Sequence, residues 1–309
     1  MGSFAPGGGL YYIGKQQLGF ARLRQRCGNS ERSFPIGWIG HNFLSIVSSI
    51  PESAAPRLAL QVDDLHVSYG PKRAVDGVSL DITDGEIFGL LGPNGAGKTS
   101  TLSAIEGLVR PDSGSIRIGE VDAVAHPTAA KARMGVQLQS TSFQSDLTIR
   151  EIVRLYAGLY GVPLSRTEID DLLANVHLGD EASKRFSQLS GGQQKRVSLL
   201  IATIHDPPLV LLDEPTAGLD PQARRQLWDR IERLRDTGRS ILLTTHSMEE
   251  AQAVCQRVAI IDRGKLLTVD TPTGLIEKHK DDPRVRKVAH GQVTLEDVFI
   301  GLTGSELRD

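Results

Sequence analysis

Little cysteine, almost no net charge and no long apolar run characterise this sequence of 309 residues. Its two cysteines, Cys27 and Cys255, are too few for a disulfide framework, so we expect a protein of a reducing compartment. The formal net charge is −2, and no strong overall field favours a nucleic-acid partner. The hydrophobic content of 39% is ordinary for a globular chain, and the length suits one large domain or two modest ones.

A membrane-spanning helix is not expected, because no segment supplies the roughly 18–20 uninterrupted apolar residues that one requires. The nearest candidate is Phe34–Ile50, which a histidine, an asparagine, two glycines, a proline and three serines interrupt. If this protein serves a membrane, another chain must therefore supply the spans.

Residues 1–56 differ from the remainder in pattern and charge. They show no sustained periodicity and hold five basic and two acidic groups (+3), which leaves 30 basic and 35 acidic groups (−5) for the rest. We expect a disordered extension or an over-extended start of the reading frame. A targeting peptide or a membrane-surface anchor is the alternative.

Regular patterns begin after this segment. Alternation of apolar and polar residues over 58–69 and 74–85 predicts half-buried strands. Short apolar runs bounded by turn residues predict central strands of a parallel sheet that is covered on both faces. These runs are Ile87–Leu91, Leu209–Asp213, Ser240–Thr245 and Val258–Asp262. Because helical patterns lie between them, we expect an α/β fold with an antiparallel, β-rich start.

Residues of about 141–188 are expected to form a small helical subdomain. Thr148 and Glu151 are spaced for a capping box at the start of one of its helices. The apolar face of that helix is predicted to comprise Ile149, Ile152, Val153, Tyr156 and Tyr160. A second short capped helix is predicted over 294–302, near the end of the chain.

A glycine-rich segment follows the apolar run 87–91 and precedes a helical pattern. It matches GxxxxGK[ST] in full and comprises Gly92, Pro93, Asn94, Gly95, Ala96, Gly97, Lys98, Thr99 and Ser100. In this context the glycines let main-chain N–H groups turn toward an anion at the positive end of a helix. We expect Lys98 to reach the β- and γ-phosphates of a nucleotide and the Thr99 hydroxyl to bind Mg²⁺. The alternative is a glycine-rich turn that arose by chance, but such a turn would not be expected between a predicted strand and a predicted helix.

Two carboxylates and a histidine end other predicted strands. Asp213 is placed to hold Mg²⁺, and Glu214 to polarise the water that attacks the γ-phosphate. An isolated acid pair would more simply be a solvated strand end, but the phosphate loop upstream favours catalysis. His246 ends the run 240–245, at the sheet edge where ligands of open α/β folds collect. A purely structural histidine is the alternative there.

The segment Gln188–Arg196 resembles a second phosphate-binding helix start. Val197, Leu200, Ile201 and Ile204 follow at i, i+3, i+4 and i+7, so an amphipathic helix is predicted to begin at Ser190. Nothing around Ser190 supplies an adenine platform, a lysine or a metal ligand. The segment is therefore half of a site, and it predicts that a second copy of the protein completes the other half.

Together these motifs resemble the ATP-binding cassette (ABC) family of ATPases over about residues 58–280. The phosphate loop, LSGGQ (189–193), LLDEP (211–215), AGLD (217–220) and TTH (244–246) occur in that family's order and spacing. The resemblance implies a P-loop NTPase core with a mostly parallel central sheet, an antiparallel β subdomain and an inserted α-helical subdomain. We therefore expect an ATP-binding domain over 57–285 and a short helical tail over 286–309.

The resemblance also implies roles for individual residues. Tyr69 matches the aromatic side chain that stacks on adenine, and a strand-end core tyrosine is the alternative. Gln139 matches the glutamine that contacts Mg²⁺ and the membrane partner, with Gln137 as its rival. Asp220 matches the loop that crosses the dimer interface, and His246 the switch histidine. The signature that binds the partner's ATP corresponds to Ser190, Gly191, Gly192 and Gln193.

The function implied is that of an ATPase subunit which dimerises around ATP, binds Mg²⁺ and powers a separately encoded membrane permease. Such a subunit lies at the cytoplasmic face of the membrane, held through the permease near residues 139–147 and Tyr156, and uses no nucleic acid. The sequence lacks an ERG-type segment before LSGGQ and contains TPTGLI (271–276) and TLEDVF (294–299). In these features it resembles the ATPase subunits of the ABC-2 class. That class commonly exports drugs, antibiotics, lipids or polysaccharides. The rival hypothesis is a soluble, non-transport ABC-type ATPase or regulator.

Overall fold

The computed structural model describes residues 57–139 and 143–304. Our expectations for residues 1–56 lie outside the described part of the chain. The first residues of the predicted helical subdomain, 141 and 142, also lie outside it. The chain divides into two units, 1–54 and 55–309, and everything described below belongs to the second. In this described part, no helix is both long and apolar enough to cross a membrane.

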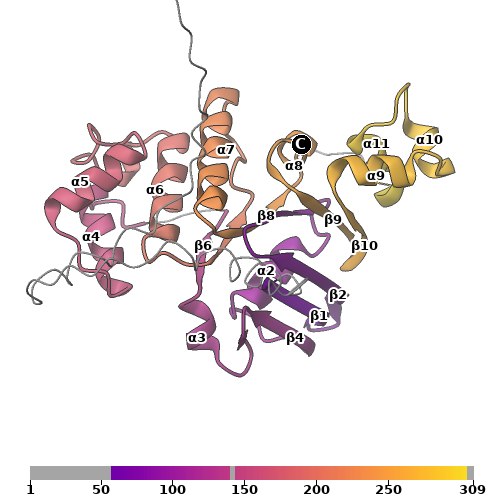
Figure 1. The fold of residues 1–309 in the computed structure, drawn as a ribbon, viewed down its shortest axis with the longest axis horizontal. Helices are drawn as coiled ribbons and strands as arrows, with labels where there is room; N and C mark the ends of the chain where they lie inside the picture. Colours follow the sequence, from indigo (N-terminus) through magenta and orange to yellow (C-terminus); the bar gives the residue numbers. More distant parts are fainter. Residues whose placement is uncertain (1–56, 140–142, 305–309) are drawn as a thin grey trace, which may run out of the picture. The chain divides into compact units, whose positions relative to one another are not determined.

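An antiparallel sheet opens the described chain, as the alternating pattern predicted (Figure 1). Its strands lie in the order β2-β1-β4-β5, with bounds Leu58–Tyr69 (β1), Lys72–Thr83 (β2), Ser113–Ile118 (β4) and Val121–Asp122 (β5). Leu60, Val62, Leu65 and Val67 point inward and are fully buried. The register of β1 on β2 shifts between Val62 and Leu65. This irregularity keeps Leu65 on the buried face although two aspartates intervene.

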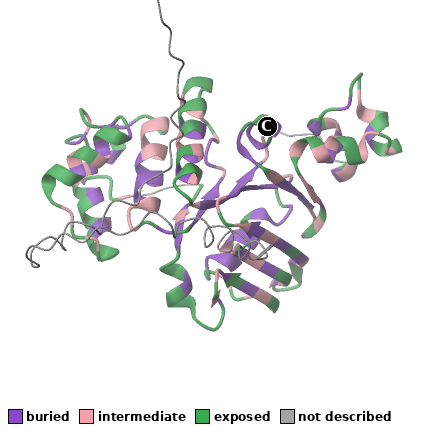
Figure 2. Cartoon of the chain, viewed as in Figure 1, coloured by how far each residue is buried: buried purple, intermediate pink, exposed green. Residues whose placement is uncertain are grey.

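The second sheet has six strands in the order β10-β9-β3-β8-β7-β6. Their bounds are Ile87–Leu91 (β3), Met134–Gln137 (β6), Leu209–Asp213 (β7), Ser240–Thr245 (β8), Arg257–Asp262 (β9) and Lys265–Asp270 (β10). All neighbours pair in parallel except β10, which is antiparallel to β9 at the edge. Every residue of β3, β7 and β8 is buried (Figure 2), so the prediction of central strands covered on both faces is confirmed.

Two apolar cores cover the faces of this sheet. Helix α2 (Lys98–Ile105) and the inner face of the antiparallel sheet contribute to one core. Helices α7 (Pro221–Asp236) and α8 (Met248–Val254) contribute to the other. The C-terminal helices join the second core and are α9 (Pro272–His279), α10 (Pro283–Val288) and α11 (Leu295–Thr303). The prediction of a capped helix near the chain end is confirmed by α11, which Thr294 caps with Asp297.

A third core lies within what we term the helical unit, formed by α4 (Ile149–Leu159), α5 (Arg166–Asn175) and α6 (Gly191–Thr203). Thr148 and Glu151 form the predicted capping box, and Ile149, Ile152 and Val153 are fully buried. The prediction for Tyr160 was wrong in part. It is the C-cap residue of α4, 43% exposed, and its ring stacks on His205 instead of entering this core.

Helix α6 is more deeply buried than its predicted amphipathic face implied. Val197, Leu200 and Ile201 enter the core of the helical unit, whereas Leu199 enters a core of the parallel sheet. Consequently residues 197–202 are buried on all sides of the helix. The helix thus joins the helical unit to the parallel sheet. A short helix, α3 (Pro127–Lys131), lies between β5 and β6 in the chain.

Candidate nucleotide-binding site

The phosphate loop connects β3 to α2 and is packed closely against two neighbouring strands. A Cβ atom on Gly92 would lie 2.5 Å from the main-chain oxygen of Ile261 in β9. A Cβ atom on Gly97 would lie 2.6 Å from the oxygen of Ala74 in β2, and φ of Gly97 is 110°. Only glycine fits both positions. In addition, the amide of Gly264, in the β9–β10 turn, donates a 2.7 Å hydrogen bond to Ala96 O.

Lys98 occupies the first turn of α2 and its side chain folds back over the loop. Its Nζ donates hydrogen bonds to Gly92 O at 2.7 Å and to Pro93 O at 3.2 Å. The same nitrogen lies 3.7 Å from Oε1 of Glu214. Burial lowers the pKa of Lys98, while the nearby carboxylates of Glu214 and Asp213 raise it in partial compensation. A buried cation is thus held among loop carbonyls, where a phosphate would lie.

Asp213 and Glu214 end β7 and are positioned by the adjacent strand. Thr244 of β8 lies opposite Asp213 in the register, and its hydroxyl donates to Asp213 Oδ1 at 2.5 Å. That hydroxyl also accepts from the amide of Glu214 at 3.0 Å. Glu214 has φ of 45°, which is unusual for a residue with a side chain and redirects the chain as the strand ends. Sequence reasoning missed Thr244, although parallel pairing of 209–213 with 240–245 would have indicated it.

Glu214 is the point at which the predicted catalytic side chains meet. The side-chain amide of Gln139 donates to Glu214 Oε2 at 2.9 Å, and His246 Nδ1 lies 3.4 Å from Glu214 Oε1. With Lys98, three groups from separate segments therefore surround one carboxylate. Gln137 does not join them, because it lies inside the sheet with 1% exposure. Of the two glutamines, only Gln139 touches the carboxylate pair.

The oxygen atoms around the site suit Mg²⁺. Asp213 offers a carboxylate, Gln139 an amide oxygen, and Thr99, an exposed residue in the first turn of α2, a hydroxyl. The described residues contain no group of three or more His, Cys, Asp or Glu arranged to hold a metal. Mg²⁺ usually keeps several waters and takes only one or two carboxylates together with substrate phosphates, so this sparse donor set fits it.

The signature residues lie at the start of α6, away from the phosphate loop of the same chain. Ser190 and Gln193 form a capping box in which Ser190 Oγ accepts from Gln193 N at 3.3 Å and Ser190 N donates to Gln193 Oε1 at 2.9 Å. Ser190 and Gly191 are exposed, and a Cβ atom on Gly191 would meet nothing within 4 Å. Within the described residues, no hydrogen bond or ion pair joins Ser190–Gln193 to the phosphate loop. This part of the predicted site is therefore separate from the rest within one chain.

Tyr69 and Asp220 also stand apart from the carboxylates. Tyr69 ends β1 and is 49% exposed, so it is not the buried core tyrosine that was its alternative. Asp220 is the N-cap of α7, where its Oδ1 accepts from Gln222 N and Ala223 N at 3.0 and 2.9 Å. Both side chains are accessible to a ligand or to a partner.

Two ionisable residues near the site were not predicted. Lys195 of α6 donates from Nζ to the main-chain oxygen of Gln139 at 2.8 Å. Burial lowers its pKa, and the carboxylates of Asp213, Glu214 and Glu250 raise it. Glu106, the C-cap of α2, is 5% exposed, and burial with the nearby charge of Asp213 raises its pKa to about 7. Lys195 lies within the segment Gln188–Arg196, although no role was predicted for it, and no local motif marks Glu106.

The sequence is similar to those of known proteins. A family model described as ABC transporter matches residues 75–217. The chain is 41% identical over 223 residues to Nod factor export ATP-binding protein I of Paraburkholderia xenovorans (strain LB400), an alignment that covers 72% of this chain and 73% of the relative. It is 33% identical over 324 residues to the protein of the same name from Rhizobium meliloti (strain 1021), covering 89% and 96% of the two chains.

Solved structures show the same fold. One described as the ATP-binding subunit of an ABC transporter matches with a TM-score of 0.68 and 28% identity, over 79% of this chain and 99% of the other. A nucleotide-free ATP-binding cassette matches with a TM-score of 0.66 and 21% identity, over 74% and 98% of the two chains. The prediction of a P-loop NTPase fold with parallel and antiparallel sheets is confirmed.

Proposed function

Since this chain belongs to the ATP-binding subunits of the ABC transporter family, whose general activity is ATP hydrolysis coupled to transport, we propose that Glu214 is its catalytic base. The observation that carries the proposal is the convergence of Lys98, Gln139 and His246 on this one carboxylate. We further propose that the chain powers export through a separately encoded permease. The relatives named for Nod factor export support that direction.

In the proposed reaction, the main-chain N–H groups of Gly92–Gly97 and the Lys98 ammonium bind the β- and γ-phosphates. Glu214 accepts a proton from the attacking water, while Gln139 and His246 fix the orientation of the carboxylate and water. Tyr69 stacks on adenine. Mg²⁺, held by Thr99, Asp213 and Gln139, would neutralise charge on the phosphate oxygens when bound.

The completed site is proposed to need two subunits. The start of α6 presents the exposed Gly191 and the half-buried Gly192 at a positive helix end, and within the described residues no hydrogen bond or ion pair joins them to Lys98, Asp213 or Glu214. We assign Ser190, Gly191, Gly192 and Gln193 to the ATP of a second copy, with Asp220 at the interface. ATP is then the shared contact of a homodimer that closes when ATP binds and opens after hydrolysis.

We also propose domain bounds and a membrane partner for this chain. We assign the ATP-binding domain to 57–285, its helical subdomain to about 141–188, and a helical tail to 286–309. The permease is proposed to bind near Tyr156 and to hold the chain at the cytoplasmic face of the membrane. An ABC-2 class exporter of a drug, antibiotic, lipid or polysaccharide is the subclass we favour. Co-purification with an integral membrane protein would distinguish this hypothesis from a soluble, non-transport ATPase.

The decisive experiment uses Glu214→Gln, which preserves shape and removes the base. We expect phosphate release to fall by about 10²–10⁴-fold, the range of general-base contributions. We also expect a dimer that persists with ATP and Mg²⁺ in size-exclusion chromatography with light scattering. The matched control is Glu249→Gln, because Glu249 is an exposed residue that pairs with Arg224. Wild-type hydrolysis by Glu214→Gln would overturn its role as base, and a monomer at saturating ATP would overturn the shared site.

A further inference from the structure

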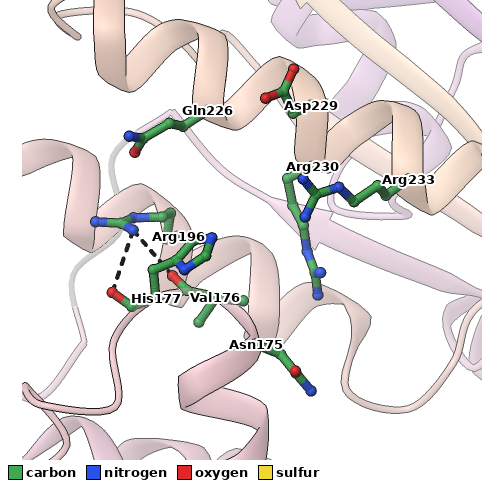
Figure 3. A pocket seen from close by; sticks show the side chains of 8 residues that line it. All are labelled: Asn175, Val176, His177, Arg196, Gln226, Asp229, Arg230 and Arg233. Carbon is green, nitrogen blue, oxygen red and sulfur yellow. Dashed lines mark hydrogen bonds between the residues drawn. The ribbon is translucent and has the colours of Figure 1, made fainter.

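An arginine-rich hollow lies between α7 and the end of α5, and no residue of the phosphate loop is among its lining residues. Its volume is about 100 Å³, and Figure 3 shows the side chains that line it. The residues that matter here are Asn175, His177, Arg196, Asp229, Arg230 and Arg233. We term it the arginine crevice. Three arginines and one aspartate are among its lining residues, so the lining is positively charged.

Arg230 is the central residue of the arginine crevice. It is half-buried, and within the described residues its side chain forms no hydrogen bond or ion pair. Burial lowers its pKa, and the neighbouring charges of Arg233 and Arg239 lower it further. A half-buried cation beside two others, without a counter-ion of its own, is stabilised when an anion joins it.

Two nearby arginines, unlike Arg230, have acidic partners. Arg224 pairs with Glu249 at 2.8 Å, and Arg239 pairs with Asp206. Arg233, one turn along α7 from Arg230, shares the same face but makes no ion pair in the described chain. Asp229 borders the crevice and is exposed, without any such pair to either arginine. Two adjacent guanidinium groups are thus available on one side of the hollow.

The opposite wall is fixed by a third arginine. Arg196 of α6 donates from Nη1 to the main-chain oxygens of Val176 and His177, at 3.1 and 3.4 Å (Figure 3). His177 has φ of 55°, so the chain turns sharply there after α5. These bonds hold the loop in place, and Arg230 extends from α7 toward Asn175 of that wall. The hollow is therefore a shaped gap between the helical unit and α7.

We propose that the arginine crevice binds a small anion of the phosphate class, held by Arg230 and Arg233 and bounded by Asn175. Planar guanidinium groups match phosphate oxygens with paired, charge-assisted hydrogen bonds. A second hollow of about 600 Å³, which Arg239 and Thr203 help to line, adjoins the same two arginines and provides access. An anion bound there bridges α7 and the helical unit, and so restrains their relative movement during ATP turnover. This regulatory site is additional to the proposed ATP site.

The test must exclude the phosphate loop, which also binds phosphates. Inorganic pyrophosphate is titrated calorimetrically, in magnesium-free buffer, into a Lys98→Ala variant and into the wild-type protein saturated with ADP. Both proteins are expected to retain one pyrophosphate site. Adding Arg230→Gln and Arg233→Gln should weaken that site at least tenfold, while Arg225→Gln, an exposed change on the same helix, should not. Thermal unfolding and basal ATPase rates of the variants with Lys98 intact verify the fold.

A parallel arm identifies the source of the phosphate. Sedimentation with phosphatidylglycerol vesicles is compared for the wild type and the double arginine variant. Vesicle binding that depends on Arg230 and Arg233, without binding of free pyrophosphate, would assign the phosphate to a lipid headgroup. The proposal is overturned if neither pyrophosphate nor vesicle binding changes in the double variant, or if the ADP-saturated wild type binds neither.

Discussion

Lys195 Nζ donates a 2.8 Å hydrogen bond to the main-chain oxygen of Gln139, whose side chain donates in turn to Glu214 at 2.9 Å. The helix that carries the signature is thereby connected to the proposed catalytic base of the same subunit through two consecutive hydrogen bonds. A displacement of α6 would move Gln139 and with it the orientation of the carboxylate. Lys195 acts through Gln139 and is therefore a positioning residue.

Lys195→Met should lower kcat for ATP hydrolysis by about tenfold with little change in KM for ATP. The reason is that a hydrogen bond to a charged donor contributes about 1.5–3 kcal/mol, which corresponds to roughly one to two powers of ten in rate. Steady-state phosphate release measures both constants. Lys184→Met serves as the control, since that lysine is an exposed residue of the helical unit. A rise in KM at constant kcat would place Lys195 in ATP binding instead.

Gly191→Asp should lower the rate of ATP hydrolysis at least about 10²-fold without loss of folding stability. A side chain at this exposed position meets no atoms, and a carboxylate at a helix N-terminus contributes about 0.3–1 kcal/mol of favourable dipole interaction. The same charge repels the phosphate that the proposed dimer brings there. Gly191→Ala, which adds volume without charge, should retain far more activity. Wild-type turnover by Gly191→Asp would exclude this helix start from the nucleotide site.

Gly135→Ala should destabilise the protein by roughly 3 kcal/mol, at the upper end of typical overpacking costs. Its Cβ atom would lie 1.9 Å from the main-chain oxygen of Ala202, where β6 packs against α6, and a backbone atom cannot move aside cheaply. Gly158→Ala is the matched control, because that helical glycine has open space around its Cβ position. The control should gain about 0.5–1 kcal/mol. Urea denaturation of both variants gives the free energies of unfolding, and equal values would contradict the packing of β6 on α6.

Glu106 should make stability fall as pH rises. Its pKa is raised from 4.5 to about 7 in the folded protein, mainly by burial, so the native state keeps a proton that the unfolded chain releases. The resulting stability is present in full below pH 4.5 and is lost as pH increases through about 7. Relative to wild type, Glu106→Gln should therefore gain thermal stability between pH 5 and pH 8. Exposed Glu120→Gln should show no such trend, and a parallel trend in both variants would refute the assignment.

Features that depend on residues close together in the sequence could be predicted, whereas contacts between distant segments could not. The central strands begin and end almost where expected, because short apolar runs bounded by turn residues are hard to bury in any other way. The helix starts at Ser190 and Thr148 were predictable for a similar reason, since a capping box is local chemistry. Tyr160 was misjudged because helical periodicity does not reveal that α4 ends there.

The contacts that complete the candidate site are of another kind. Thr244 reaches Asp213 only because β8 pairs with β7 in one register, across 31 positions of sequence. Lys195 reaches Gln139 across 56 positions, through the packing of α6 against the sheet. Neither distance follows from residue spacing, so the motifs predicted which side chains meet at Glu214 but not which residues hold them in place.

The close packing of the phosphate loop has a consequence for the energetics of nucleotide capture. Gly92 and Gly97 lie against main-chain oxygens of β9 and β2, and the Gly264 amide bonds to Ala96, so neighbouring backbone maintains the loop shape without any ligand. The proposed phosphate site is therefore preorganised, and little binding free energy is diverted to ordering it.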